Sequence, residues 1–240
     1  YLVIECTNSP TKQGDGIAPF SISDAGEMLI LKNAEGMIVD AFDSGVLTPE
    51  ITSGRIEGDT TTARVFFESP TRGRENSTDI TTGVAPQPAF SDLSLYHDSA
   101  FSVAITCDDP NAEIYYTTDG DEPSLDSHRY TEPVQISDST PLRAVSYVSS
   151  KRLSEITTAT YLFEEKHTVP VVCITGNADR IQEVLSVDDK FQKVERLANI
   201  SFYEPDGVLG VSFPAGIKPK GAGTIIYSQK SLSINLRAGY

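Results

Sequence analysis

Residues 114–123 read IYYTTDGDEP and predict a β-strand that runs into a sharp turn. Side chains alternate between the two faces of a strand, so Tyr115 and Tyr116 should point in opposite directions. In the turn, Asp119 can accept hydrogen bonds from backbone N–H groups, and Gly120 can adopt a positive φ. Pro123 then fixes the direction in which the chain leaves. The stretch therefore predicts a module built from short strands and tight turns.

The sequence on both sides of this stretch also predicts short strands. Phe101, Val103, Ile105 and Cys107 alternate with smaller or polar residues, which is the period of a strand with one buried face. Alternation returns at 142–148, and a last strand is expected at 157–163. Several strands separated by turn signals predict a small immunoglobulin-like β-sandwich over residues 88–163.

Residues 1–76 also predict strands. We expect a short buried strand at Leu2, Val3 and Ile4, and a hairpin formed by 28–31 and 37–39. Gly36 should supply the positive φ of the hairpin turn. Residues 77–87 contain Ser, Thr, Gly and Pro with few large apolar side chains, which is the composition of a linker.

Residues 164–240 differ from the rest of the chain. A buried strand at 169–174 precedes Asn177, which can cap a helix that carries Ile181, Val184 and Leu185 at helical spacing. Strands follow at 194–203 and 208–213, joined by the turn Pro-Asp-Gly at 205–207, and a further pair is expected at 216–218 and 231–236. This segment is predicted to be α+β.

Charge and composition narrow the possible partners. The formal net charge is −15, which argues against a nucleic-acid partner, because phosphate binding needs clustered Lys and Arg. No apolar run is long enough to span a membrane. Cys6, Cys107 and Cys173 are three cysteines without paired spacing, so they do not form a complete disulfide framework.

Residues 20–76 resemble the second half of a lamin-tail domain, which is an immunoglobulin-like β-sandwich. The resemblance rests on FSIS at 20–23, GEMLIL at 26–31, GMIVD at 36–40, SGR at 53–55 and SPTRGREN at 69–76. The first half of that family has no counterpart here, and the opening YLVIEC reads like the middle of a domain. We therefore expect this chain to be part of a longer protein.

Residues 88–163 resemble the small β-sandwich at the C-terminal side of chitobiase and hexosaminidase enzymes. The matching stretches are PAFS at 88–91, IYYTTDG at 114–120, LRA at 142–144 and TY at 160–161. In that family the module accompanies catalytic domains and is not known to carry out chemistry, so the resemblance implies a non-catalytic role.

Residues 167–240 resemble the beginning of the CotH family, spore-coat proteins with an atypical kinase fold. The matching stretches are VPVV at 169–172, SFY at 201–203, PDG at 205–207, AGIK at 215–218, QKSL at 229–232 and NLR at 235–237. The family's usual arginine before the following glycine, and its serine a few positions later, are replaced in this chain near 220–224. Its acidic metal-binding residues would follow position 240.

A nucleotide site is the candidate that this resemblance raises. Glycines at 216, 221 and 223 could let backbone N–H groups approach phosphates, and a lysine on a strand adds a positive charge. The candidate phosphate contacts are Lys218, Lys220, Gly221 and Lys230. Glycines between strands are more often plain hairpin turns, and phosphoryl transfer also needs a metal-holding Asp or Asn.

The central stretch allows two further interpretations. Asp119, Asp121, Glu122 and Asp126 crowd one turn and invite a calcium site, but the spacing fails the EF-hand pattern and ordinary turn chemistry accounts for them better. The exposed ring of the Tyr115–Tyr116 pair could stack on a sugar, although a single tyrosine on a sheet usually serves packing.

The sequence thus predicts a mainly all-β fold, with tandem immunoglobulin-like β-sandwiches followed by a partial α+β kinase-like lobe. The expected domains are 1–76, a linker at 77–87, then 88–163 and 164–240. We expect a non-catalytic scaffold or interaction region of a multi-module extracellular or cell-surface bacterial protein, with no cofactor and no activity of its own. Its partner would be a protein or a cell-wall or glycan surface.

Two alternatives remain open at this point. The chain could belong to an active atypical protein kinase that uses ATP and magnesium, with residues 216–237 contributing to ATP binding. It could also be a carbohydrate-binding module.

Overall fold

The computed structural model divides the chain into two compact units. The first comprises Tyr1–Val84 with Ser150–Arg152, and the second comprises Ala85–Ser149 with Leu153–Ala238. The structure describes residues 2–9, 14, 16–23, 25–45, 47, 51–56, 58, 64–67, 69–76, 80–81, 83–163, 165–189, 191, 194–221 and 225–236. Residues 77–79 and 82 of the expected linker, and the candidate residue Gly223, lie outside these residues.

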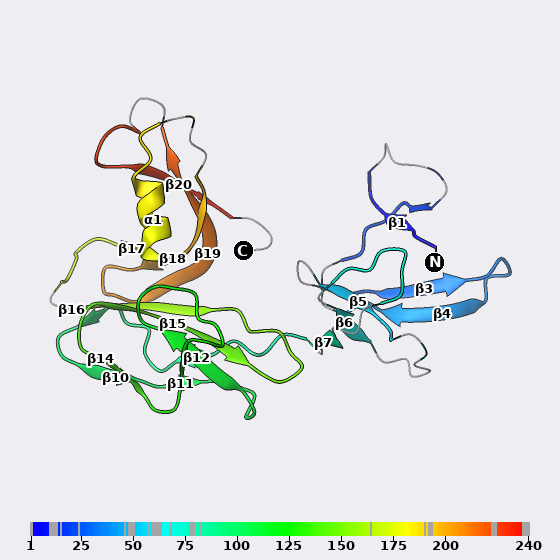
Figure 1. Cartoon of the computed structure of the whole chain (residues 1–240), viewed down its shortest axis with the longest axis horizontal. Helices are drawn as coiled ribbons and strands as arrows, with labels where there is room; N and C mark the ends of the chain where they lie inside the picture. Colours follow the sequence, from blue (N-terminus) through cyan, green and yellow to red (C-terminus); the bar gives the residue numbers. More distant parts are fainter. Residues whose placement is uncertain are drawn as a thin grey trace. The chain divides into compact units, whose positions relative to one another are not determined.

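The first unit consists of short strands in three small sheets (Figure 1). The strands β1 (Glu5–Cys6) and β2 (Ile17–Ala18) pair in parallel, and β3 (Met28–Lys32) and β4 (Ile38–Asp43) form an antiparallel hairpin. The third sheet has the order β5 (Thr52–Gly54), β6 (Val65–Phe67) and β7 (Ile80–Thr81).

The hairpin was predicted correctly, and the first strand was not. Gly36 has φ +81° in the hairpin turn, as its position required. The expected buried strand at Leu2, Val3 and Ile4 is wrong, because Leu2 is 83% exposed and the first strand begins at Glu5. An apolar run is therefore not sufficient evidence for burial here, since Val3 and Ile4 are exposed as well.

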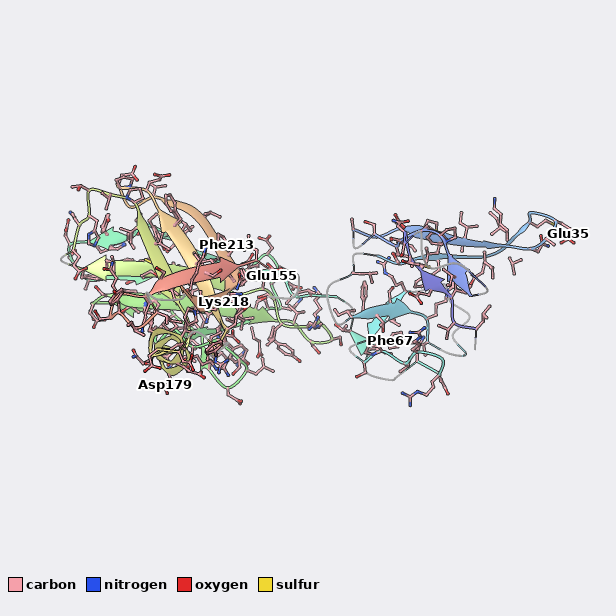
Figure 2. All side chains as sticks on the ribbon, turned by 90° about the horizontal axis from the view of Figure 1, so that it is seen from above. Glu35, Phe67, Glu155, Asp179, Phe213 and Lys218 are labelled. Carbon is pink, nitrogen blue, oxygen red and sulfur yellow. The ribbon has the colours of Figure 1, made fainter. Side chains whose placement is uncertain are left out.

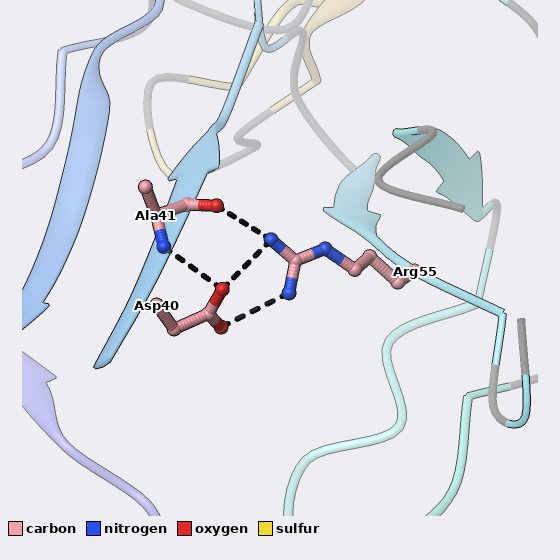
Figure 3. Close-up of polar contacts among 3 residues, drawn as sticks. All are labelled: Asp40, Ala41 and Arg55. Atoms are coloured by element: carbon pink, nitrogen blue, oxygen red, sulfur yellow. Dashed lines mark hydrogen bonds and ion pairs between the residues drawn. The ribbon is translucent and has the colours of Figure 1, made fainter. Parts of the chain in front are cut away.

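Within the first unit, an arginine links the hairpin to the three-stranded sheet (Figure 3). Arg55, which follows β5, donates two hydrogen bonds of 3.0 Å to the carboxylate of Asp40 on β4. A third goes to the backbone carbonyl of Ala41 at 2.5 Å. The hydrogen bond from Arg55 lowers the pKa of Asp40 below its usual value. A bidentate pair of this kind fixes orientation as well as distance.

The second unit begins with a two-layered β-sandwich. One layer is a five-stranded sheet, and the facing layer is made of two strand pairs. The five-stranded sheet has the order β13 (His128–Arg129), β12 (Glu113–Thr117), β15 (Thr140–Tyr147), β16 (Thr157–Phe163) and β9 (Tyr96–His97). The facing pairs are β10 (Phe101–Val103) with β14 (Val134–Ile136), and β8 (Ala89–Phe90) with β11 (Ile105–Thr106).

The predicted alternation builds the core of this sandwich. Val103 and Ile105 are buried between the layers together with Leu142, Ala144 and Tyr161. Phe101 and Cys107, the outer members of the same alternating run, are partly buried against this cluster. The mainly β prediction for this region is confirmed.

A second sheet with one helix follows in the same unit. The antiparallel sheet has the order β17 (Val171–Thr175), β18 (Arg196–Tyr203), β19 (Leu209–Lys220) and β20 (Ser231–Asn235). The helix α1 (Ala178–Leu185) lies against this sheet (Figure 1), and its Val184 packs on Ala198, Ile200, Ala215 and Ile217. The side chain of Asn177 accepts a hydrogen bond from the backbone N–H of Arg180, as a helix cap should.

This segment differs from the prediction in one respect. The strands expected separately at 208–213 and 216–218 are a single strand, β19, because the chain stays extended through Pro214. A kinase-like lobe is not shown, since the described residues of 164–240 hold one sheet and one eight-residue helix.

The sandwich and the second sheet are joined by hydrogen bonds. The backbone N–H of Thr160 on β16 donates to the hydroxyl of Tyr203 on β18. The N–H of Leu95 donates to the carbonyl of Gly207, and Asn177 Nδ2 donates to Asp121 Oδ1 at 2.7 Å. The turn predicted from residues 114–123 is thus a point at which the two parts of the second unit meet.

Candidate binding cleft

The residues predicted to contact phosphates gather at one end of β19 and β20. Lys218 and Lys220 are two positions apart on β19, Gly221 follows directly, and Lys230 precedes β20. Lys220 pairs in register with Ser231, the neighbour of Lys230. The structure therefore brings these four positions together, and Gly223 lies outside the described residues.

Two of these three lysines already have partners. Lys230 Nζ donates hydrogen bonds to the backbone carbonyls of Val187, at 2.8 Å, and Ile225. Lys218 Nζ lies 3.8 Å from Glu195 Oε2. Lys220 is exposed at the end of its strand. The hydrogen bonds of Lys230 thus hold the segments around Val187 and Ile225 next to the start of β20.

The acidic turn is held by its own backbone. Asp119 Oδ1 accepts a hydrogen bond from the N–H of Asp121 at 3.0 Å, and Gly120 has φ +92°. Thr117 Oγ1 donates to the carbonyl of Asp121 at 2.7 Å. Within the described part of the chain, no group of three or more His, Cys, Asp or Glu is arranged to hold a metal ion. These contacts support the turn interpretation.

The two tyrosines of the central strand have separate environments. Tyr116 packs against the sandwich core. Tyr115 lies on the other face, where its hydroxyl donates to Glu113 at 2.7 Å, and this bond raises the pKa of Tyr115. Glu113 is also paired with Arg129 at 2.8 Å. Tyr115 is thus held by its neighbours.

A cleft that no sequence pattern predicted opens between the sandwich and the second sheet. The cleft has a volume of about 440 Å³, within the range of small-molecule sites. The sandwich contributes Glu122, Arg143 and Glu155, and the second sheet contributes Asn199, Leu209 and Phe213. Glu155 and Phe213 are labelled in Figure 2. A smaller cavity of about 170 Å³ adjoins it, because Glu122, Arg143 and Leu197 line both.

Arg143 is the central charged group of this cleft. Its side chain is only 5% exposed, although it lies on the face of β15 away from the core residues Leu142 and Ala144. Its Nη1 donates to the carbonyl of Gly120 at 2.9 Å, and its Nε lies 3.4 Å from Thr158 Oγ1. Burial lowers the pKa of Arg143, while Glu122 and Asp121 oppose this effect.

No described carboxylate forms an ion pair with Arg143. A guanidinium carries five N–H donors, and the two bonds to Gly120 and Thr158 use two of them. Burying a charge without a direct ion-pair partner is costly. An arginine in this state on the wall of a cavity is therefore suited to bind a ligand oxygen.

The acceptors of the cleft surround this arginine. Among the described residues, neither the Glu122 nor the Glu155 carboxylate has a hydrogen bond or an ion pair, and both side chains are exposed. Asn199 is buried, and its Nδ2 donates to Ser201 Oγ at 2.9 Å and Ser212 Oγ at 2.8 Å. These bonds fix the amide and leave its Oδ1 as an acceptor.

Comparison with known families supports the sandwich assignment. Residues 103–161, from the end of β10 into β16, match the family described as Fn3 associated. No curated protein and no solved structure matches the chain. Together with the mainly β fold, the family match fits an immunoglobulin-like β-sandwich module. In the described residues, the one helix is too short to cross a membrane.

Proposed function

We propose that this chain is a non-catalytic interaction region of a multi-module extracellular or cell-surface bacterial protein, and that it binds its partner through the cleft around Arg143. The match to the Fn3-associated family supports an extracellular interaction module. The single observation that carries the cleft is the buried guanidinium of Arg143, which lines a cavity without an ion-pair partner among the described residues.

The finer domain assignment is part of the same proposal. Residues 1–76 correspond to the second half of a lamin-tail domain, and 77–87 to a linker. Residues 88–163 correspond to a chitobiase C-terminal-type sandwich, and 164–240 to the beginning of a CotH-type domain. The stretches quoted for each resemblance support this layout.

A nucleotide site at the end of β19 is the second candidate, because one observation favours it. Lys220 is exposed beside Gly221, which has φ +122°, so a cation and a glycine turn adjoin at that place. In this reading the longer protein would bind ATP and magnesium through residues 216–237.

Two measurements test the proposed function. In intact cells that produce the full protein, a membrane-impermeant amine-labelling reagent should label lysines of this region. The purified chain should show no change of melting temperature with magnesium and ATP. A protein labelled only after lysis would refute the surface location. Stabilisation by magnesium and ATP that is lost in Lys220→Ala would support the nucleotide site instead.

A further inference from the structure

We propose that the ligand of the cleft around Arg143 is a neutral glycan. This inference rests on the proposed function and names the chemical class of its partner. It follows from the hydrogen-bonding groups, the apolar wall, the charge balance and the strand pairing of the cleft.

The polar groups of the cleft match sugar hydroxyls. A hydroxyl donates one hydrogen bond and accepts others, so a polyol needs donors and acceptors side by side. Arg143 supplies N–H donors, and Glu122, Glu155 and the Oδ1 of Asn199 supply acceptors. Each of these groups is planar, and a planar group can bind two neighbouring hydroxyls at once.

The second sheet also contributes apolar side chains to the cleft. Phe213, Leu209 and Leu197 line the cleft from this side, and Ile156 and Leu93 line it from the sandwich. A sugar ring presents C–H groups on its faces and hydroxyls at its edges. Packing those C–H groups on Phe213 removes apolar surface from water while the hydroxyls reach the polar groups.

The charges of the cleft favour a ligand without net charge. Glu122 and Glu155 would repel an anion, and the formal net charge of −15 adds long-range repulsion. The buried Arg143 would repel a cation. Because the carboxylates and the net charge oppose an anion, a neutral polyol fits the cleft better than an acidic glycan or a phosphate.

The strand pairing disfavours an added peptide strand. Peptides that extend a sheet need a free strand edge. At the cleft, β15 has a neighbouring strand on both sides. The strand β9 accompanies β16 only at Leu162 and Phe163, but the N–H of Thr160 on the open edge of β16 already donates to the Tyr203 hydroxyl. The first half of β19 pairs with β18 alone, but Pro214 interrupts its free edge because proline has no N–H donor. These occupied or missing backbone donors disfavour an added strand, so we assign recognition at the cleft to its side chains.

Titration of the intact chain with soluble oligosaccharides, followed by amide NMR and calorimetry, tests this proposal. The probes are neutral oligomers of glucose and of N-acetylglucosamine, and an oligogalacturonate serves as the acidic comparison. We expect a neutral oligomer to shift the amide signals of β18, β19 and residues 154–158. The acidic oligomer should bind more weakly.

Two sets of variants locate the binding. Glu122→Gln with Glu155→Gln changes exposed groups and should leave the fold intact, while the affinity should fall about tenfold, the cost of one or two weakened hydrogen bonds. Arg143→Lys keeps the charge but removes the planar fork, and should also weaken binding. Glu132→Gln and Arg129→Lys are the matched controls outside the cleft and should bind as the wild type does.

The proposal is wrong if no neutral oligomer shifts the cleft signals, if the acidic oligomer binds more tightly, or if the Glu122→Gln, Glu155→Gln chain binds unchanged. A cell-binding assay separates this failure from failure of the proposed function. Labelled chain that binds cells through the cleft, but loses binding when the cells are treated with protease, would leave an interaction region whose partner is a protein. Binding that survives protease and is lost after glycosidase treatment supports the glycan.

Discussion

The hydroxyl of Tyr203 lies 3.0 Å from the backbone nitrogen of Thr160 and accepts its hydrogen bond. Tyr203 belongs to the second sheet and Thr160 to the sandwich. The strand β9 accompanies β16 only at Leu162 and Phe163, so the tyrosine supplies an acceptor where that strand pairing has ended. Because Tyr203 is completely buried, this bond joins two parts of the second unit away from water.

Replacing Tyr203 by phenylalanine should destabilise the second unit. The ring still fills its space, but the N–H of Thr160 loses its acceptor, which costs about 1–3 kcal/mol for a buried donor. Urea denaturation, monitored by tyrosine fluorescence and amide signals of the second unit, measures the change. Tyr227→Phe is the matched control, because Tyr227 is largely exposed, and it should leave the midpoint unchanged. Equal effects of both substitutions would contradict the role of the buried bond.

The same tyrosine predicts an alkaline limit of stability. Burial raises the pKa of Tyr203 to about 12, whereas the unfolded chain should have the ordinary value near 10. The unfolded state therefore gives up this proton first, and the stabilisation is complete below the unfolded pKa and lost as the pH rises through the folded pKa. Between these two values, the free energy of unfolding should fall more steeply for the wild type than for Tyr203→Phe. Parallel curves would show that another group sets the alkaline limit.

Lys230 offers a test that separates a structural lysine from a nucleotide contact. Its ammonium donates to the carbonyls of Val187 and Ile225, so Lys230→Met should lower the free energy of unfolding by about 1–3 kcal/mol. The matched control is Lys220→Met at an exposed strand end, which should change stability little. Thermal melts of both variants, with and without magnesium and ATP, give the comparison. A stable Lys230→Met chain that no longer responds to ATP would contradict the structural role.

In the first unit, the pair of Asp40 and Arg55 should be sensitive to acid. The hydrogen bond from Arg55 lowers the pKa of Asp40, so its contribution to stability is present above the unfolded value and is lost as the pH falls through the folded pKa. NMR titration of the Asp40 carboxyl should show this lowered value in the wild type. In Arg55→Gln the value should rise toward that of a free aspartate. An unchanged titration would mean that the pair does not persist in solution.

Local structure could be predicted where the residues that determine it lie within one short stretch of sequence. The hairpin turn at Gly36, the turn at Gly120 and the helix cap at Asn177 each depend on residues within a few positions. The core of the sandwich followed from the alternation of Val103 and Ile105, because burial on one face imposes that period.

The cleft could not be predicted in the same way. Arg143 sits in an alternating run of β15 and looks like a polar residue on an exposed face, yet it is buried because the second sheet covers that face. Its neighbours Glu122, Glu155 and Asn199 come from distant positions in the chain, and only the packing of two sheets brings them together. The exposed apolar residues near Leu2 show the converse, because an apolar run becomes buried only where another layer covers it.

Gly120, the glycine of the central turn, is required for two separate reasons. Its φ is +92°, where a residue with a Cβ is strained, and a Cβ added there would lie 2.7 Å from the carbonyl oxygen of Gly176, which directly follows β17. Gly36 has a similar φ of +81° but open space around it, so an alanine at this position measures the cost of backbone strain alone. Gly36→Ala should therefore cost about 1–2 kcal/mol in the first unit.

Gly120→Ala should cost more in the second unit, because the Gly176 carbonyl must also move. Hydrogen exchange of amides in each unit measures the two costs separately within one chain. The NMR signals of the amides near Gly176 and Asn177 should shift in Gly120→Ala and should keep their wild-type positions in Gly36→Ala. If the two alanine substitutions cost the same and the signals near Gly176 do not move, the contact between the turn and the second sheet is absent in solution.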